Sequence, residues 1–235
     1  MDKKVEVFRN KLFKLSEEFT QFCFMSRAKE FQLQSCQQLE ELKAEASSLK
    51  KEMVKVHDED SANALLSFEE MILALTSELK MWVALKEDDP NSAWDLLTDA
   101  QTAARTAMQA HSVANHLEKY LQRLNQLENL LFPPQTFFSP GMTIRYSECS
   151  ICGSEYGECN HVVGRAYMGE MCVRIIKDFE LREVSLVEEP ANKRARMLSI
   201  SDGGVKRDFL TWRVIPPESA EQKTQTTVDS ARHQE

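Results

Sequence analysis

The sequence predicts an α+β protein, in which a long antiparallel helical hairpin or three-helix bundle precedes a small β-rich domain. Three observations predict this class. All seven glycines lie between 141 and 204, and Pro90 is the only proline before Pro133. Helix interiors tolerate glycine and proline least, so residues 1–132 should form long helices. After Pro134 the apolar residues form the short runs that are typical of strands.

The first predicted helix runs from about 4 to 56. Its apolar residues recur three or four positions apart, which is the spacing of one helix face. They are Val5, Phe8, Leu12, Leu15, Phe19 and Phe22, followed by Leu39, Leu42, Ala46, Leu49, Met53 and Val56. We expect a bend or a change of partner between 26 and 38, where the pattern is interrupted. A helix of this length would extend for roughly 80 Å at 1.5 Å per residue, so the helical part should be elongated.

Two further helices are expected in this helical arm. One runs from Ser61 to about Glu87 and has a broad apolar face, which requires more than one neighbour. The other begins at 91 or 92, where Ser92 with an acid three residues later resembles a capping box, and it ends at Leu131. Its alanine-rich first half allows another helix to approach closely, and its second half returns to large apolar residues.

The β-rich domain is expected over residues 133–215. Four strands are predicted, at 142–146, 184–187, 194–200 and 205–214. The last two flank a hairpin turn at Ser201-Asp202-Gly203-Gly204. A short helix is predicted at 167–180, where apolar residues share one side. From 216 to 235 the chain has almost no large apolar residue, which predicts a disordered tail.

The densest motif is CSICGSEYGECNH, which begins at Cys149. Cys149 and Cys152 form a C-x2-C knuckle, and Cys159 and His161 follow it. These four ligands suit a tetrahedral zinc ion at about 2.0–2.3 Å and leave no position open for water, so the sequence predicts a structural zinc ion. Cys172 is an alternative for one of the four. Unmetallated buried thiols and a redox-active Cys149/Cys152 pair are the alternatives to a metal.

Charge and hydropathy disfavour two broad classes. The formal net charge of −8 disfavours a protein that wraps around nucleic acid. No apolar run approaches the ~18 residues that a membrane-spanning helix needs, and the first ten residues lack the apolar stretch of a secretory signal. We therefore expect a cytoplasmic protein without a membrane segment, in which reduced thiols favour metal binding over disulfides.

The stretch EVSLVEEPAN, residues 183–192, resembles the E-V-S-L-V-x-x-P-A-N signature of tailed-phage prohead (capsid maturation) proteases. Some phage proteins of this kind carry a C-x-x-C-G…C-x-H-x-x-G-x-x-Y insert. The matching residues here are Cys149, Cys152, Gly153, Cys159, His161, Gly164 and Tyr167. More loosely, Ser139-Pro140-Gly141 is similar to the S-x-G segment that holds the nucleophilic serine of that family. The likeness covers roughly 139–200, less than a third of the chain.

The resemblance does not extend to a complete protease. In that family the serine needs an upstream histidine within hydrogen-bond reach to take its proton. The upstream histidines here, His57, His111 and His116, lie in predicted long helices, and Pro140 directly after Ser139 is a further departure. We therefore expect a non-catalytic binding module. A serine protease with Ser139 as nucleophile is the alternative.

A basic segment follows between 193 and 213. Its six cations stand against only Asp202 and Asp208, and Phe209 and Trp212 are interleaved with them. The cations are Lys193, Arg194, Arg196, Lys206, Arg207 and Arg213. Positive charge beside aromatic rings suits phosphates and bases, so this segment, with Trp212, is a candidate surface for nucleic acid or a protein partner. A solvated hairpin whose aromatic residues belong to the core is the alternative.

These features together predict a non-enzymatic accessory or adaptor subunit of a multiprotein complex. The helical arm should bind protein partners or a second copy of the chain, and the zinc-stabilised domain should recognise a target. The resemblance implies a phage, prophage or bacterial antiphage complex. A nucleic-acid-binding subunit that uses 193–213 and a serine protease are the alternatives.

Overall fold

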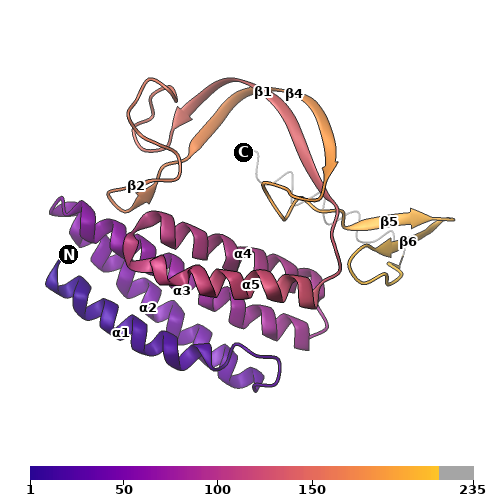
Figure 1. Cartoon of the computed structure of the whole chain (residues 1–235), viewed down its shortest axis with the longest axis horizontal. Coiled ribbons are helices and arrows are strands. Elements are labelled where there is room, and N and C mark those ends of the chain that lie inside the picture. Colours follow the sequence, from indigo (N-terminus) through magenta and orange to yellow (C-terminus); the bar gives the residue numbers. More distant parts are fainter. Residues whose placement is uncertain (217–235) are drawn as a thin grey trace, which may run out of the picture.

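The computed structural model describes residues 1–216 and confirms the α+β class (Figure 1). In this part of the chain, five α-helices and one 3₁₀-helix precede six β-strands. The helices are α1 (Lys3–Thr20), α2 (Lys29–Lys55), α3 (Glu59–Lys86), α4 (Pro90–Ala110), η1 (Ser112–Leu117, the 3₁₀-helix) and α5 (Glu118–Leu131). The predicted tail lies outside the described residues except for Pro216.

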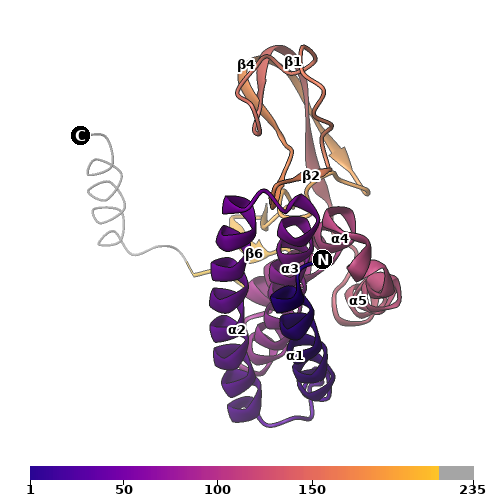
Figure 2. The same cartoon turned by 90° about the vertical axis from the view of Figure 1, so that its left-hand side faces the viewer.

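Helix α3 is the centre of the bundle. It packs against α1, α2 and α4, while α5 packs against α4 (Figures 1 and 2). Residues on nearly every side of α3 are buried. Phe68 of α3 meets Phe8 of α1 with ring centroids 5.9 Å apart. Because apolar faces of several helices converge on α3, most buried apolar residues of the bundle form one continuous core, beside a small cluster of Ala74, Ala103 and Ala104.

One charged pair lies inside the bundle. The side chain of Glu78 on α3 is fully buried and accepts two hydrogen bonds from Arg123 of α5, at 2.6 and 2.7 Å. The guanidinium lies 5.1 Å from the ring centroid of Tyr120, whose hydroxyl donates to the Ala74 carbonyl at 3.2 Å. A bidentate pair of this kind satisfies both carboxylate oxygens, so it fixes α5 against α3.

The expected bend in the first helix is a complete reversal of the chain. It lies at 21–28, between α1 and α2, rather than at 26–38. Folding back places the apolar face of α1 on α2 and α3 instead of in solvent. The buried Gln32 amide stabilises the reversal, because it donates to the carbonyls of Phe22 (2.9 Å) and Phe24 (3.1 Å).

The third predicted helix is also divided. Helix α4 ends at Ala110, and His111 has an extended backbone (φ −159°, ψ 147°) before η1 and α5. The His111 ring accepts the N–H of Val113 at 3.1 Å, which caps η1. At the start of α4 the capping residue is Asp89 rather than Ser92, because the Asp89 carboxylate accepts the Ser92 N–H at 3.1 Å.

The strands form three separate two-stranded antiparallel sheets. The pairs are β1 (Phe137–Cys149) with β4 (Arg174–Val187), β2 (Ala166–Tyr167) with β3 (Glu170–Met171), and β5 (Ser199–Asp202) with β6 (Val205–Asp208). The predicted helix at 167–180 is wrong. Met168 and Gly169 have positive φ angles, 48° and 80°, that turn the chain, and β4 pairs with β1 along its length.

The β5–β6 hairpin follows the predicted turn. Gly203 and Gly204, with φ angles of 56° and 81°, connect the two strands. Positive φ at both central residues is the usual geometry of a two-residue hairpin turn. The strands predicted at 194–200 and 205–214 are each reduced to four residues. Residues 195–197 instead hydrogen-bond to Thr136 and Phe138, and after Asp208 the chain turns, with the N–H of Trp212 donating to the Asp208 carbonyl.

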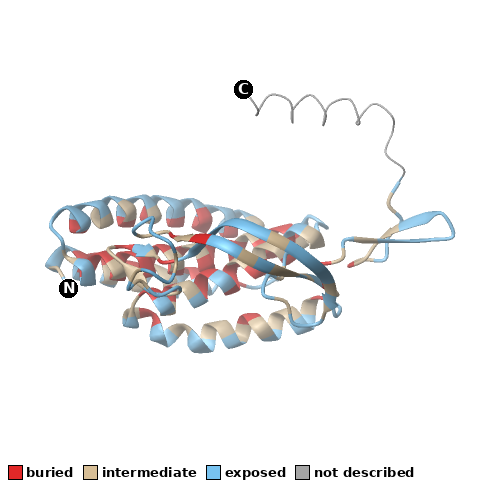
Figure 3. Cartoon of the chain, turned by 90° about the horizontal axis from the view of Figure 1, so that it is seen from above, coloured by how far each residue is buried: buried red, intermediate tan, exposed pale blue. Residues whose placement is uncertain are grey.

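The β1–β4 ribbon crosses over the bundle as an arch (Figures 1 and 2). Figure 3 shows that the ribbon is mostly exposed, whereas buried residues are concentrated in the helices. All but three residues of β4 are exposed. The ribbon is therefore attached near its ends and has little protein against its middle.

Candidate metal centre and β-ribbon

The metal-ligand motif begins where β1 ends. Cys149 is buried, and its carbonyl accepts the N–H of Gly153 at 2.9 Å, which closes a tight turn. Gly153 has a φ of 73° in this turn. The ligand atoms of Cys149, Cys152, Cys159 and His161 all lie within 4.8 Å of one another. This Cys3His group can bind a metal ion.

Local hydrogen bonds favour the thiolate form of two of these sulfurs. Burial raises the pKa of Cys149, but hydrogen bonds from the turn N–H groups and from the neighbouring thiols together outweigh burial and lower it to about 7. The N–H and hydroxyl of Ser154 lower the pKa of Cys152. The N–H of His161 lowers the pKa of Cys159, but burial and the neighbouring thiols have the larger combined effect, so this pKa is raised overall. Because the thiolate is the metal-binding form, the Cys149–Cys152 knuckle is suited to a cation.

His161 is held in place by Tyr167. Their rings meet edge to face, with centroids 4.7 Å apart and an interplanar angle of 88°. The Tyr167 hydroxyl accepts the N–H of Val162 at 3.0 Å. The Nδ1 atom of His161 is buried and has no hydrogen-bond partner among residues 1–216. A buried polar atom without a partner is costly, and a metal ion beside the three cysteines would satisfy it.

Cys172 lies beside the four ligands but outside their group. Its side chain is buried, and its sulfur is 3.8 Å from the sulfur of Cys149. Burial raises the pKa of Cys172 to about 11, so it remains a thiol that can donate to the Cys149 sulfur. A hydrogen bond of this kind orients a metal ligand without adding another one.

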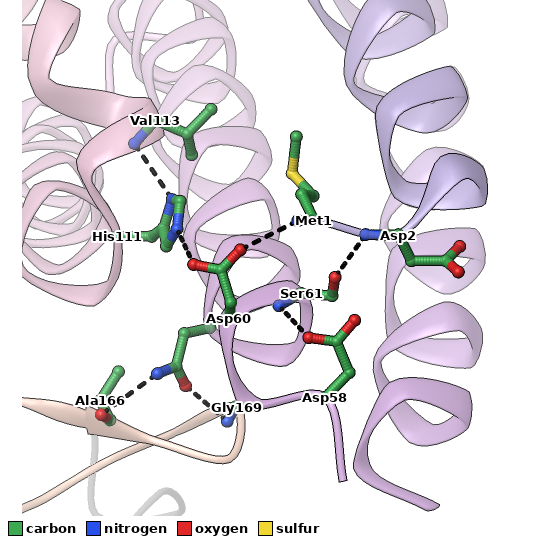
Figure 4. Close-up of polar contacts among 10 residues, drawn as sticks. Met1, Asp2, Asp58, Asp60, Ser61, His111, Val113, Ala166 and Gly169 are labelled. Atoms are coloured by element: carbon green, nitrogen blue, oxygen red, sulfur yellow. Dashed lines mark hydrogen bonds and ion pairs between the residues drawn. The ribbon is translucent and has the colours of Figure 1, made fainter. Parts of the chain in front are cut away.

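Residues 149–161, which carry the four metal ligands, are called the metal knuckle below. The β2–β3 hairpin fixes the metal knuckle to the bundle. Asn63 of α3 donates to the Ala166 carbonyl at 3.3 Å and accepts the N–H of Gly169 at 2.8 Å (Figure 4). A Cβ at Gly169 would lie 3.0 Å from the Lys50 side chain and 3.3 Å from the Ala62 carbonyl. With a φ of 80° as well, this position accepts only glycine without strain.

The same end of α3 is a junction for other segments. Asp60 accepts a hydrogen bond from His111 at 3.1 Å and lies 3.3 Å from the main-chain nitrogen of Met1 (Figure 4). Since Nδ1 of His111 accepts the Val113 N–H, its Nε2 carries the hydrogen that Asp60 accepts. This bond lowers the pKa of Asp60. Segments next to α1, α4 and the metal knuckle therefore meet at the first turns of α3.

The other end of the ribbon is fixed by Trp94 of α4. The Trp94 ring meets Phe132 and Phe137, with centroids 5.3 and 6.0 Å apart. Its indole N–H donates to the Lys193 carbonyl at 3.1 Å, and the guanidinium of the buried Arg196 lies 5.8 Å from its ring centroid. The ribbon is therefore tied to the bundle by an aromatic cluster at one end and by Asn63 at the other.

Most cations of the basic segment face the helices. Three of the six form ion pairs with bundle acids, which are Lys193–Glu128 (2.5 Å), Arg194–Asp99 (2.5 Å) and Arg213–Asp88 (2.6 Å). Arg196 is buried against Trp94. Lys206 and Arg207 lie on β6, where Arg207 donates to the carbonyl of Trp212, a residue whose side chain is exposed. The segment thus docks the end of the described chain onto the bundle.

Ser139 lies in β1, directly opposite Ser185 of β4. The two segments of the family resemblance, around Ser139 and over 183–192, are therefore neighbours. His111 hydrogen-bonds to Asp60, and His116 hydrogen-bonds within η1. Among the described residues no histidine hydrogen-bonds to Ser139, so the structure does not bring these residues together as a catalytic pair.

The ribbon has one apolar and one polar face. Directly opposite residues of an antiparallel pair share a face. On one face the pairs are Phe138–Leu186, Pro140–Val184, Met142–Leu181 and Ile144–Phe179; on the other they are Ser139–Ser185, Gly141–Glu183 and Thr143–Glu180. Arg182 is an extra residue in β4 at this point, a β-bulge. Because the bulge absorbs this residue, Val184 and Leu181 share the apolar face although they are three positions apart. In a regular strand, a spacing of three would place them on opposite faces.

The apolar face points away from the bundle where β1 begins. Phe137 packs on Trp94, and the adjacent Phe138 points to the opposite side of the strand. The large side chains of this face are exposed by 39% at Phe138, 52% at Phe179, 54% at Leu181, 57% at Val184 and 60% at Leu186. Sequence reasoning missed this face because the bulge interrupts its alternation in β4 and because part of β4 was predicted as a helix.

No family model, no curated protein and no solved structure matches this chain. Within residues 1–216, none of the helices combines the length and apolarity that crossing a membrane requires.

Proposed function

We propose that this chain is a non-enzymatic assembly protein, an adaptor that binds other protein chains through the apolar face of the β1–β4 ribbon. The observation that carries the proposal is the exposure of that face. Contiguous exposed apolar side chains mark interaction surfaces. A two-stranded ribbon is also only marginally stable in water unless something packs against it.

Attachment at both ends suits the ribbon for binding. Trp94 and Asn63 hold its two ends on a bundle that has its own core. The backbone of the ribbon is therefore ordered before a partner arrives. Pre-ordering lowers the entropic cost of association and so raises affinity.

The proposed ion of the metal knuckle is zinc, in a structural role. Three thiolates and an imidazole are a donor set of structural zinc sites, whereas magnesium and calcium prefer oxygen ligands. Four protein ligands leave no position for a reacting water. When bound, the ion supplies a cross-link between the end of β1 and residues 159–161. Free thiols that serve as ligands fit a reducing, cytoplasmic setting.

The ribbon is favoured over the basic segment as the recognition surface. Four of the six cations of that segment are engaged by the bundle, which leaves Lys206 and Arg207 beside Trp212 for phosphate contacts. Non-specific nucleic-acid binding draws on many simultaneous cation–phosphate contacts. The resemblance of 139–200 to prohead proteases supports a phage-derived setting for the adaptor.

The test is native mass spectrometry of the protein purified from its own cells. The ribbon variant Val184→Lys with Leu186→Lys places two charges on the apolar face, and the control Thr143→Lys with Ser185→Lys places two on the polar face. We expect one zinc ion per chain in all three proteins, and bound partner chains in the wild type and control only. Equal recovery of partners with the ribbon variant, or a wild type without metal, would overturn the proposal.

A further inference from the structure

We propose that the partner on the apolar face is a second copy of this chain, with two β1–β4 ribbons packed face to face about a two-fold axis. This inference rests on the proposed function, because it names the occupant of the face assigned there. This packing would form a homodimer whose centre is a four-stranded sandwich of the two ribbons.

Among residues 1–216, no segment covers the large side chains of the face. Where β1 begins, the bundle lies on the Phe137 side of the ribbon, and the apolar face is on the Phe138 side. Residues 217–235, outside the described part, contain no aromatic residue, and Val228 is their only branched aliphatic residue. That composition offers too little apolar surface to pack against the eight side chains of the face.

The area of the face is sufficient for a dimer. A free side chain of this size has roughly 150–200 Å² of surface. The five large side chains, each 39–60% exposed, thus contribute roughly 400–500 Å² per chain, so two such faces would bury roughly 800–1,000 Å². Pro140, Met142 and Ile144 add to this area and bring it to the ~1,000 Å² that a specific interface needs.

The charge distribution is compatible with self-association. None of the eight side chains of the apolar face is charged, so two copies meet there without burying like charges. The charged pairs Arg145–Glu180 and Arg182–Glu180 accompany the polar side of the ribbon. Two amphipathic ribbons stacked about 10 Å apart would cover both apolar faces and leave both polar faces in water.

Pairing of β4 with an added strand is less favoured than face-to-face packing. The outer edge of β4 makes no backbone hydrogen bond to another described segment. However, the strand carries Arg174, Lys177, Arg182 and Glu183, and charged side chains are a common protection of exposed edges. Edge pairing would also leave the apolar face uncovered.

The test is the mass of the full-length protein in solution, measured by light scattering coupled to size exclusion at micromolar concentration. We expect the wild type and the Thr143→Lys/Ser185→Lys control at twice the 27.0 kDa mass of one chain, and Val184→Lys/Leu186→Lys at the mass of one chain. Because Val184 and Leu186 are exposed in the single chain, the variant should keep its metal content and circular dichroism.

A photo-reactive amino acid locates the contact. At position 181, on the apolar face, it should give covalent dimers, and at position 143, on the polar face, it should not. A monomeric wild type, a dimer that persists in the ribbon variant, or cross-links only from 143 would each overturn the inference. A monomeric wild type whose other partner is lost on Val184→Lys/Leu186→Lys would overturn only the second copy and leave the adaptor function standing.

Discussion

The helical bundle and the β-ribbon are stabilised in opposite ways. Helix α3 is buried on nearly every side, and its neighbours share one continuous apolar core. Strand β4 is exposed along most of its length, pairs with no strand other than β1 among the described residues, and reaches the bundle core only at Val187. The ribbon instead depends on its attachments, which are the Trp94 cluster at one end and the metal knuckle with Asn63 at the other.

This difference shows how one chain can combine a stable body with an open surface. A core supplies stability by hiding apolar side chains, so it leaves none for a partner. A ribbon fixed at its ends keeps its apolar side chains exposed and still has a defined shape. Breaking the attachments should therefore affect the ribbon alone, whereas core substitutions should affect the whole protein.

Loss of the metal ligands should have the largest effect. Structural zinc contributes about 10–16 kcal/mol of apparent binding free energy in small zinc domains. Cys159→Ala should therefore abolish metal binding and open residues 150–165 to proteases, while the helical circular dichroism stays unchanged. The matched control Cys36→Ala, which removes a buried thiol of α2, should keep one metal ion per chain. A protease-resistant Cys159→Ala protein would contradict the structural role of the ion.

Removal of Arg123 should have the next largest effect, on the bundle. Arg123→Ala leaves the fully buried carboxylate of Glu78 without its partner, and such a loss costs about 3–5 kcal/mol. Chemical denaturation should report this decrease in unfolding free energy with unchanged metal content. Replacing both residues, by Glu78→Leu with Arg123→Leu, should restore most of the stability, because no buried charge remains. A double variant as unstable as Arg123→Ala would contradict this reading of the pair.

Loosening the junction at Asn63 should have a moderate, local effect. Asn63→Ala removes two hydrogen bonds to the β2–β3 hairpin and leaves the Ala166 carbonyl and the Gly169 N–H without these partners, at a cost of about 1–3 kcal/mol. Hydrogen exchange should accelerate at the hairpin and not in α3. The control Asn10→Ala, at an exposed position of α1, should change neither.

The smallest effect is expected at the cap of α4. Asp89→Ala should lower the unfolding free energy by about 0.5–2 kcal/mol. The hydroxyl and N–H of Ser92 lower the pKa of Asp89 below its unfolded value of about 3.9. This stabilisation is therefore complete above that pH and disappears as the pH falls through the folded pKa. The control Asp89→Asn should keep the cap without the pH dependence, and equal pH profiles for all three proteins would contradict the assignment.

Local signals in the sequence predicted more than distant contacts did. The Cys3His ligands lie within thirteen residues, so their spacing alone indicated the group that the structure brings together. The turn at Gly203-Gly204 is equally local. The chain reversal at 21–28 was placed wrongly because buried polar residues of α2, Gln32 and Ser35, interrupt the apolar spacing inside a continuous helix.

The ribbon could not be predicted for a related reason. Ile175, Ile176 and Phe179 fit the spacing of a helix face, and only pairing with β1 makes them part of a strand. The bulge at Arg182 then changes which residues of β4 share a face. Both features depend on the partner strand, whose paired residues lie roughly 25 to 50 positions away in the chain.

The contrast between the two regions is tested most directly by hydrogen exchange of the full-length protein before and after a chelator removes the metal. We expect amides of residues 137–187 to lose protection while those of α3 keep it, because only the ribbon depends on the metal knuckle. Uniform loss of protection in both regions, or no change in the ribbon, would contradict the division into a self-sufficient bundle and a ribbon held by its attachments.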